Sequence, residues 1–161
     1  MPDPDRPLRV GVVGCGAFGR NHARVYRDLE GDPWVKVKLV GVVDADKARA
    51  NTVAAQFGTH AFGSVGELSA AGIDAVSVAV PTVAHLAIAR ELMESGVDLL
   101  IEKPIAGTLA EADELLTIAR RHHRIVQVGH LERFNPAVRS DRKSTRLNSS
   151  HSGESRMPSS A

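Results

Sequence analysis

The chain has 161 residues and a formal net charge of +1, and 43% of its residues are hydrophobic. That length and composition suit one globular domain with a real hydrophobic core. Cys15 is the only cysteine, which excludes an internal disulfide, and no segment is apolar enough to predict a membrane span. Residues 1–140 hold 16 of the 20 basic and 17 of the 19 acidic residues without a basic run, so no nucleic-acid partner is expected.

The first residues do not look like a targeting signal. Residues 1–7 are polar and rich in proline, whereas a secretory signal peptide has a charged start and an apolar middle. We therefore expect residues 1–6 to be disordered and the protein to be cytoplasmic, a compartment that keeps thiols reduced. Cys15 is interpreted as a small filler residue, with a redox-sensitive thiol as the alternative.

The first structured segment joins a strand, a glycine turn and a helix. Apolar residues at 8–13 lead into Gly14-x-Gly16-x-x-Gly19, and a helical pattern follows over 18–29. The first glycine permits a sharp turn, the second lets a phosphate approach the main chain, and the third lets the helix pack against the strand. The helix N-terminus attracts anions. The sequence therefore predicts a dinucleotide pyrophosphate site at Gly14, Gly16, Ala17, Phe18 and Gly19.

A second strand, over 36–43, ends in an acid. Asp44 lies 25 positions after Gly19, slightly beyond the spacing of about 20 residues typical of dinucleotide-binding units. Its carboxylate would accept hydrogen bonds from both adenosine ribose hydroxyls and repel a 2′-phosphate. Ala45 follows rather than Arg or Ser, so the pattern favours NAD over NADP. The alternative is that Asp44 is the N-cap of a helix starting near Lys47.

The remaining segments up to residue 129 continue to alternate between strands and helices. Strands are expected over 58–62, 75–80, 98–102 and 124–129, and helices over 48–57, 66–71, 83–95 and 109–123. Thr108 and Glu111 form a capping box for the last helix, and Gly96 is expected to cap the helix before it. Six strands alternating with helices predict an α/β fold, a doubly wound parallel sheet of the Rossmann type.

Ligands of such a sheet bind outside the carboxyl ends of its strands. The fifth expected strand ends in Glu102-Lys103-Pro104. A lysine at that position can exchange a proton with a sugar hydroxyl while hydride leaves the same carbon. The alternative is a surface lysine that pairs with Glu102.

The order of these motifs resembles the glucose–fructose oxidoreductase / inositol dehydrogenase (Gfo/Idh/MocA) family of NAD(P)-dependent oxidoreductases. The glycine turn, Asp44, Pro81-Thr82-x-x-His85 and Glu102-Lys103-Pro104 carry the resemblance, which covers residues 6–140. It implies that Lys103 is the catalytic lysine near the nicotinamide and that Glu102 contacts the cofactor's ribose region. It also implies that the cofactor path is lined by Pro81, Thr82 and His85. His22 fits the family pattern too.

Residues 128–137 resemble one subgroup of this family. The segment Gly-His-x-Glu-Arg-Phe-Asn-Pro is similar to family members that act on nucleotide sugars, particularly UDP-N-acetylglucosamine 3-dehydrogenases. Those enzymes oxidise the sugar 3-hydroxyl to a ketone with NAD. The resemblance implies that Arg133 and Asn135 contact the substrate, and a guanidinium suits a diphosphate or a pair of sugar hydroxyls. The alternative is that Arg133 and Phe134 anchor the start of the next domain.

The last 21 residues have a different character. Seven residues of 141–161 are serine and none is aromatic, so the segment cannot bury enough apolar surface to fold. It resembles an in-frame translation of a common sequencing adapter, with residues 141–151 matching the constant arm and 154–161 the distal arm. We therefore interpret 141–161 as a non-native disordered tail. A natural disordered tail is the alternative.

The expected organisation is a Rossmann domain over 7–129 and the start of a substrate domain over 130–140. Family members continue into a second α/β domain that carries a helper histidine and often the oligomer interface. The resemblance therefore implies a homo-oligomeric full-length enzyme with a sugar or nucleotide-sugar substrate, and an inactive 161-residue fragment. No metal site is expected. An inositol or simple-sugar dehydrogenase and a noncatalytic NAD-binding regulatory module are the alternatives.

Overall fold

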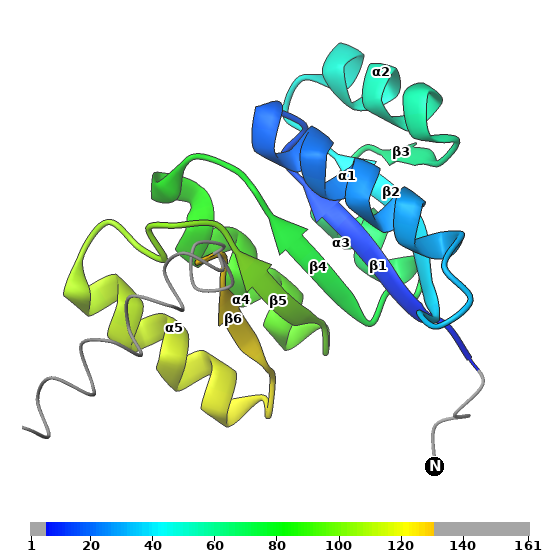
Figure 1. Cartoon of the computed structure of the whole chain (residues 1–161). Helices are drawn as coiled ribbons and strands as arrows, with labels where there is room; N and C mark the ends of the chain where they lie inside the picture. The colour runs from blue at the N-terminus through cyan, green and yellow to red at the C-terminus, as the bar shows by residue number, and fades with distance from the viewer. Residues whose placement is uncertain (1–5, 131–161) are drawn as a thin grey trace, which may run out of the picture. The chain divides into compact units, whose positions relative to one another are not determined.

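Six parallel strands form a sheet with the order β3-β2-β1-β4-β5-β6 (Figure 1). The computed structural model describes residues 6–130, so the predicted contacts Arg133 and Asn135 and the tail 141–161 lie outside it. The strands are β1 (Leu8–Val13), β2 (Val37–Val43), β3 (His60–Phe62), β4 (Ala75–Val78), β5 (Asp98–Ile101) and β6 (Val126–Val128). The helices are α1 (Ala17–Glu30), α2 (Lys47–Phe57), α3 (Val65–Ala70), α4 (His85–Glu94) and α5 (Leu109–Arg121), with a 3-10 turn, η1 (Thr82–Ala84).

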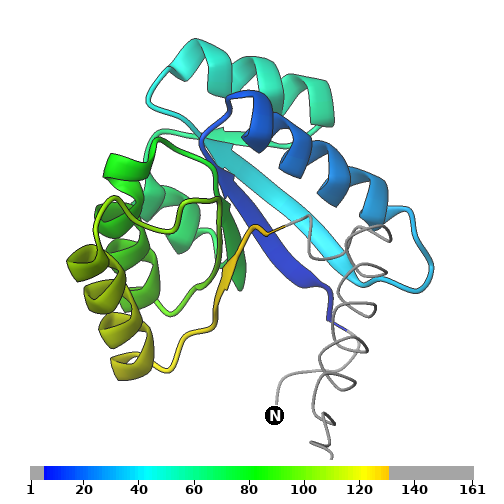
Figure 2. The ribbon, with the colours of Figure 1, turned by 60° about the vertical axis from the view of Figure 1, so that its left-hand side comes forward.

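The strand order confirms the predicted doubly wound fold. β1 pairs in parallel with both β2 and β4, so the chain winds outward from β1 in one direction and then returns to wind in the other. Helices α1 and α2 cover one face of the sheet, and α3, α4 and α5 cover the other (Figures 1 and 2). Right-handed crossovers produce this arrangement and leave a switch point between β1 and β4.

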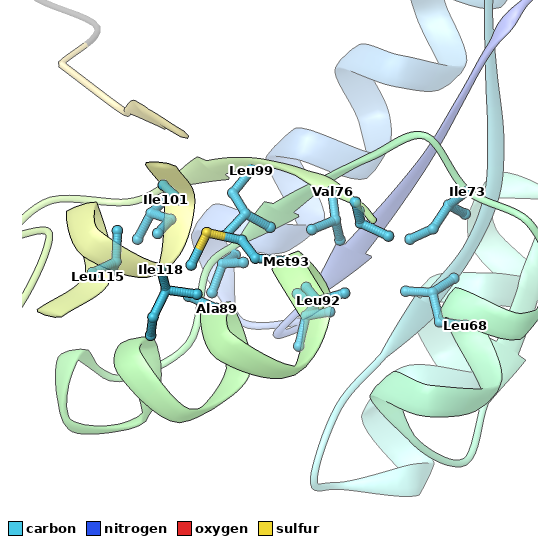
Figure 3. Packing of buried hydrophobic residues seen from close by; sticks show 14 of the residues in the cluster. Leu68, Ile73, Val76, Ala89, Leu92, Met93, Leu99, Ile101, Leu115 and Ile118 are labelled. Atoms are coloured by element: carbon cyan, nitrogen blue, oxygen red, sulfur yellow. The ribbon is translucent and has the colours of Figure 1, made fainter. Parts of the chain in front are cut away.

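Each face of the sheet has its own hydrophobic core. On one face Val10 and Val12 of β1 pack with Ala23 of α1 and with residues of α2. On the other face Leu92 and Met93 of α4 lie against the strand residues (Figure 3), together with Leu68, Val76, Leu99, Ile101 and Leu115. Successive strand residues point to opposite faces, which is why covering both faces requires a nearly continuous apolar run.

Most element ends differ from the prediction by one or two residues, as β4 and α4 illustrate. β4 ends at Val78 rather than at residue 80: its pairing with β1 stops at Val13, where the Ala79 N–H donates to the Val13 carbonyl, and the chain then turns into η1. Ser95 is the C-cap of α4, and Gly96 follows it with φ of +84°. That left-handed conformation favours glycine, so the expected stop signal acts one position later.

Asp74 joins the starts of three strands. Its carboxylate accepts hydrogen bonds from the Arg9 backbone N–H at 2.8 Å and from the Arg6 guanidinium at 2.5 Å. Its carbonyl accepts the backbone N–H of Asp98. Partial burial works to raise the pKa of Asp74, but the hydrogen bonds from Arg9 and Arg6 outweigh it and hold the pKa below its usual value.

We predict that Asp74→Asn lowers the free energy of unfolding by about 1 kcal/mol, because a charge-assisted hydrogen bond is lost while an amide oxygen still accepts from the main chain. A carboxyl group with a lowered folded-state pKa stabilises fully above its unfolded pKa of about 4 and progressively less as the pH falls below that value. Urea unfolding at pH 7 and at pH 3 checks both points. Asp28→Asn, in an exposed pair with Arg24 on α1, is the control and should change little.

Candidate functional site

Loops that follow β1 to β4 border one groove at the carboxyl edge of the sheet. The groove encloses about 720 Å³ and has a mostly apolar lining. It lies at the switch point between β1 and β4, which is where a doubly wound sheet binds a dinucleotide. Six of the residues predicted to bind a cofactor line the groove: Gly14, Gly16, Ala17, Phe18, Asp44 and Pro81.

Three glycines shape the first turn for different reasons. Gly14 has φ of +92°, and a Cβ on it would lie 2.4 Å from the Ala79 carbonyl oxygen. A Cβ on Gly19 would lie 1.6 Å from the carbonyl oxygen of Gly14, so α1 packs on the turn only because Gly19 has no side chain. A Cβ on Gly16 would meet no atom within 4 Å. The Gly16 main chain therefore faces open space in the groove, as the close approach of a phosphate requires.

The Asp44 carboxylate is held by main-chain groups on two loops. One oxygen accepts from the Cys15 N–H at 2.6 Å and the other from the Asp46 N–H at 2.8 Å. The N-cap of helix α2 is Asp46 rather than Asp44. The Asp46 side chain accepts hydrogen bonds from the backbone N–H groups of Ala48 and Arg49. The N-cap interpretation of Asp44 is therefore wrong, and its carboxylate stands at the rim of the groove.

Arg49 is a groove residue that the sequence analysis missed. Its Nη1 lies 3.2 and 3.4 Å from the two carboxylate oxygens of Asp44, and its Nη2 lies 3.4 Å from the carboxylate of Asp46. The sequence feature that could have identified Arg49 is its position in the first turn of α2, five residues after Asp44. Its positive charge offsets part of the repulsion that Asp44 exerts on an anion at this rim.

Glu102 follows β5 and is nearly buried, with only 8% of its surface exposed. Its Oε1 lies 2.8 Å from His22 Nε2 on α1, and its Oε2 accepts from the Lys103 N–H at 3.3 Å. A Cβ on Gly129 would lie 3.1 Å from this carboxylate, so the chain that leaves β6 packs directly against it. The structure thus encloses Glu102 between α1, β5 and the end of β6.

Lys103 is exposed at the carboxyl end of β5, and its peptide bond to Pro104 is cis. Within residues 6–130 its ammonium group forms neither an ion pair nor a hydrogen bond. Lys103 is thus a surface lysine, but the pairing with Glu102 that the alternative expects is not formed, because the partner of that carboxylate is His22. The lysine remains available to a ligand at the edge of the sheet.

His85 is buried in the structure. It is 1% exposed and does not line the groove, and its ring nitrogens lie 2.9 Å from the Val80 carbonyl oxygen and 3.2 Å from that of Ile105. His85 thus braces the loop after β4 against the loop after β5. The physical reason is its place on the buried face of α4, which repeats at Ala89 and Leu92. Thr82, in η1, does not line the groove either.

Residues 6–130 contain neither a metal site nor a membrane-spanning helix. No group of His, Cys, Asp and Glu side chains in this range could hold a metal ion. No helix in the same range is long and apolar enough to cross a membrane.

Comparison with known proteins identifies the family of the chain. Residues 8–130 match the Gfo/Idh/MocA model, described as an oxidoreductase family with an NAD-binding Rossmann fold. The chain belongs to this family. A UDP-N-acetylglucosamine 3-dehydrogenase of Acidithiobacillus ferrooxidans is 40% identical over 131 residues, which make up 81% of this chain and 39% of that enzyme. A solved structure of that enzyme from this organism superposes with a TM-score of 0.76, covering 84% of this chain and 41% of the other.

Two other relatives extend the comparison. Inositol 2-dehydrogenase 1 of Saccharopolyspora erythraea is 38% identical over 135 residues, which make up 81% of this chain and 39% of that enzyme. GenD2 from gentamicin A biosynthesis, solved in complex with NAD, is 32% identical with a TM-score of 0.70, covering 77% of this chain and 34% of the other. The chain spans 39% of the length of these curated relatives. The matched part is the NAD-binding Rossmann fold of the family.

We predict that the Cys15 thiol is inert in the folded Gfo/Idh/MocA domain. Burial, and after it the nearby Asp44 carboxylate, raises the pKa of Cys15 to about 12, although Arg49 opposes the shift. Because the thiolate is the reactive form, labelling by a thiol-specific disulfide reagent at pH 8 should be at least ~100-fold slower in buffer than in urea. Cys15→Ser supplies the blank. Labelling in buffer as fast as that of a small free thiol would support the redox-sensitive alternative instead.

Proposed function

We propose that this chain is the N-terminal part of an NAD-dependent oxidoreductase that transfers hydride between NAD and the hydroxyl-bearing carbon of a sugar or nucleotide sugar. The observation that carries the proposal is the shared edge of the sheet. The glycine groove and the Glu102-Lys103 pair both follow the carboxyl ends of parallel strands. A cofactor and a proton-exchanging side chain therefore belong to the same edge.

The residues of the groove fit a dinucleotide. The open space at Gly16 and the N-terminus of α1 suit the pyrophosphate, because unpaired backbone N–H groups and the helix dipole attract anions. Asp44 would accept hydrogen bonds from the adenosine ribose, and Pro81 also lines the groove. These contacts support NAD, while Arg49 beside Asp44 reduces the expected discrimination against NADP.

Lys103 is the proposed catalytic residue. When bound, NAD supplies the nicotinamide carbon that exchanges hydride with the substrate. Lys103 then has to exchange one proton with the hydroxyl on the reacting carbon, as a positioned general base or acid does. Glu102, held by His22, would contact the ribose on the nicotinamide side. The proton would therefore be exchanged at the exposed amine of Lys103, next to the Glu102 carboxylate, which is already hydrogen-bonded to His22.

We propose a nucleotide sugar as substrate, on the strength of 40% identity to a UDP-N-acetylglucosamine 3-dehydrogenase. Arg133 and Asn135 remain the predicted substrate contacts. The 38% identity to an inositol 2-dehydrogenase supports an inositol or simple-sugar dehydrogenase as the second candidate. A cytoplasmic, homo-oligomeric full-length enzyme completes the proposal. A noncatalytic NAD-binding module is less favoured, because such a module needs no exposed lysine beside Glu102.

Gly16→Ala tests the cofactor groove. The backbone at Gly16 has φ of −67°, which alanine adopts without strain, and the added Cβ meets only open space, so the melting temperature should change little. The methyl group would occupy the space that a phosphate needs, so we expect NAD⁺ affinity to fall at least ~10-fold by calorimetry. Gly31→Ala, at the other end of α1 with φ of −84°, is the matched control. Equal NAD⁺ affinity in all three proteins would contradict the proposed groove.

Lys103→Ala tests the chemistry in the full-length protein, whose gene is recovered by sequencing the source DNA across codons 140 and 141. We expect kcat for NAD-linked oxidation of UDP-N-acetylglucosamine or myo-inositol to fall by about 10²- to 10⁴-fold, while NAD⁺ affinity stays within about threefold. Lys38→Ala, an exposed lysine on β2, is the control. Unchanged turnover in the Lys103 variant would refute the assignment, and source DNA that ends after Ala161 would favour the regulatory module.

A further inference from the structure

Four polar side chains form a continuous row that ends at Glu102. Tyr26 Oη lies 2.7 Å from Ser77 Oγ, and Ser77 Oγ lies 3.3 Å from His22 Nδ1. His22 Nε2 in turn lies 2.8 Å from Glu102 Oε1. Ser77 of β4 is fully buried and Glu102 nearly so, while Tyr26 and His22 come from α1. Buried polar groups in such a row have to satisfy one another.

The geometry allows one direction of donation through the whole row. Burial raises the pKa of Tyr26 although the hydrogen bond to Ser77 opposes the shift, so Tyr26 keeps its proton. The phenol then donates to Ser77 Oγ, the Ser77 hydroxyl donates to His22 Nδ1, and the His22 Nε2–H donates to Glu102. An ionised carboxylate only accepts, so it is the natural end of the row.

The imidazolium form of His22 would disturb this order, because its Nδ1–H would donate to Ser77 Oγ. Either the Ser77 hydroxyl would then donate to Tyr26, or the Tyr26 hydroxyl would still donate to Ser77. In both cases one of the two hydroxyl protons has no acceptor within residues 6–130. Ser77 is fully buried and Tyr26 is partly buried, so leaving one of their hydroxyl protons unsatisfied is unfavourable, and the row favours neutral His22 with its proton on Nε2.

We propose that neutral His22 is a positioning residue, which orients the Glu102 carboxylate and, through it, the main chain of Lys103. The proposal rests on the proposed function, in which Glu102 and Lys103 act at the nicotinamide end of the cofactor. With Oε1 fixed by His22, Oε2 is aimed at the Lys103 N–H at 3.3 Å. The close approach of Gly129 leaves the carboxylate little room to rotate.

The placement of His22 gives this contact a further consequence. Gly16 is the N-cap of α1, and His22 lies less than two turns further along the same helix. The helix that would hold the pyrophosphate at its N-terminus therefore also orients the Glu102 carboxylate, through His22. One rigid element fixes both ends of the proposed cofactor path, which lowers the ordering cost of binding.

The first test reads the His22 tautomer directly. Nitrogen NMR of the ¹⁵N-histidine-labelled 161-residue chain at pH 7.5, with His22 assigned by comparison with His22→Gln, should show a proton on Nε2 and none on Nδ1. A proton on Nδ1 alone, or on both nitrogens, would overturn the proposal. This measurement needs neither cofactor nor substrate, and it uses a chain whose fold is unaltered.

The second test separates positioning from folding. NAD⁺ affinity is measured by calorimetry for the unaltered chain, His22→Leu and His22→Gln, with His60→Leu as an exposed control. We expect about tenfold weaker binding for His22→Leu, the typical effect of losing a charge-assisted hydrogen bond, and binding within about twofold of the unaltered chain for His22→Gln. The Gln amide can replace the Nε2–H donor, whereas Leu cannot. The Lys103 amide resonance should move in His22→Leu and not in His22→Gln.

Two results of the second test would contradict the role of His22. Equal NAD⁺ affinity and an unmoved Lys103 amide in His22→Leu would overturn the proposal, as would an equal loss in His22→Leu and His22→Gln. If the unaltered chain fails to bind NAD⁺, the proposed function loses its cofactor. The tautomer and the Lys103 amide shift then still decide whether His22 positions Glu102.

Discussion

Among the glycines of residues 6–130, Gly19 leaves the least room for a side chain, because it packs against the carbonyl oxygen of Gly14. Any side chain on Gly19 would place its Cβ 1.6 Å from that oxygen. The contact lets α1 start with only three residues between it and the end of β1 and pack against the sheet. Everything on the α1 face follows from that placement, since it brings Gly16 to the groove and His22 to Glu102. A larger residue would push the helix away and separate the two.

Several site residues are held before any ligand arrives. Asp44 is fixed by two backbone N–H groups, and Glu102 by the His22 ring and the Lys103 N–H. Carboxylates that already have donors do not need to be reorganised on binding, and this lowers the entropy lost when a ligand is ordered. Arg49 differs from them, because half of its side chain is exposed and it contacts Asp44 from the solvent side.

Local patterns in the sequence were sufficient to predict the elements and their order. Glycine spacing, the Thr108–Glu111 capping box and the alternation of apolar runs are all encoded within short windows. The contacts that short windows do not contain were missed: His22 reaches Glu102 across 80 positions, and Ser77 reaches His22 across 55. The end of β4 was misplaced for the same reason, since it depends on where the pairing with β1 stops, at Val13. Burial of His85 is encoded locally, in the helical spacing of His85, Ala89 and Leu92 on α4.

Glu102 and Lys103 are neighbours with opposite environments. The carboxylate turns under α1 and is almost buried, whereas the ammonium group reaches the surface at the edge of the sheet. If Glu102 lacked His22, its charge would be drawn to the nearest cation, and Lys103 is one residue away. By supplying a neutral donor, His22 satisfies the carboxylate without a salt bridge from the lysine. The row from Tyr26 to Glu102 therefore accounts for the availability of Lys103, the group on which the proposed proton exchange depends.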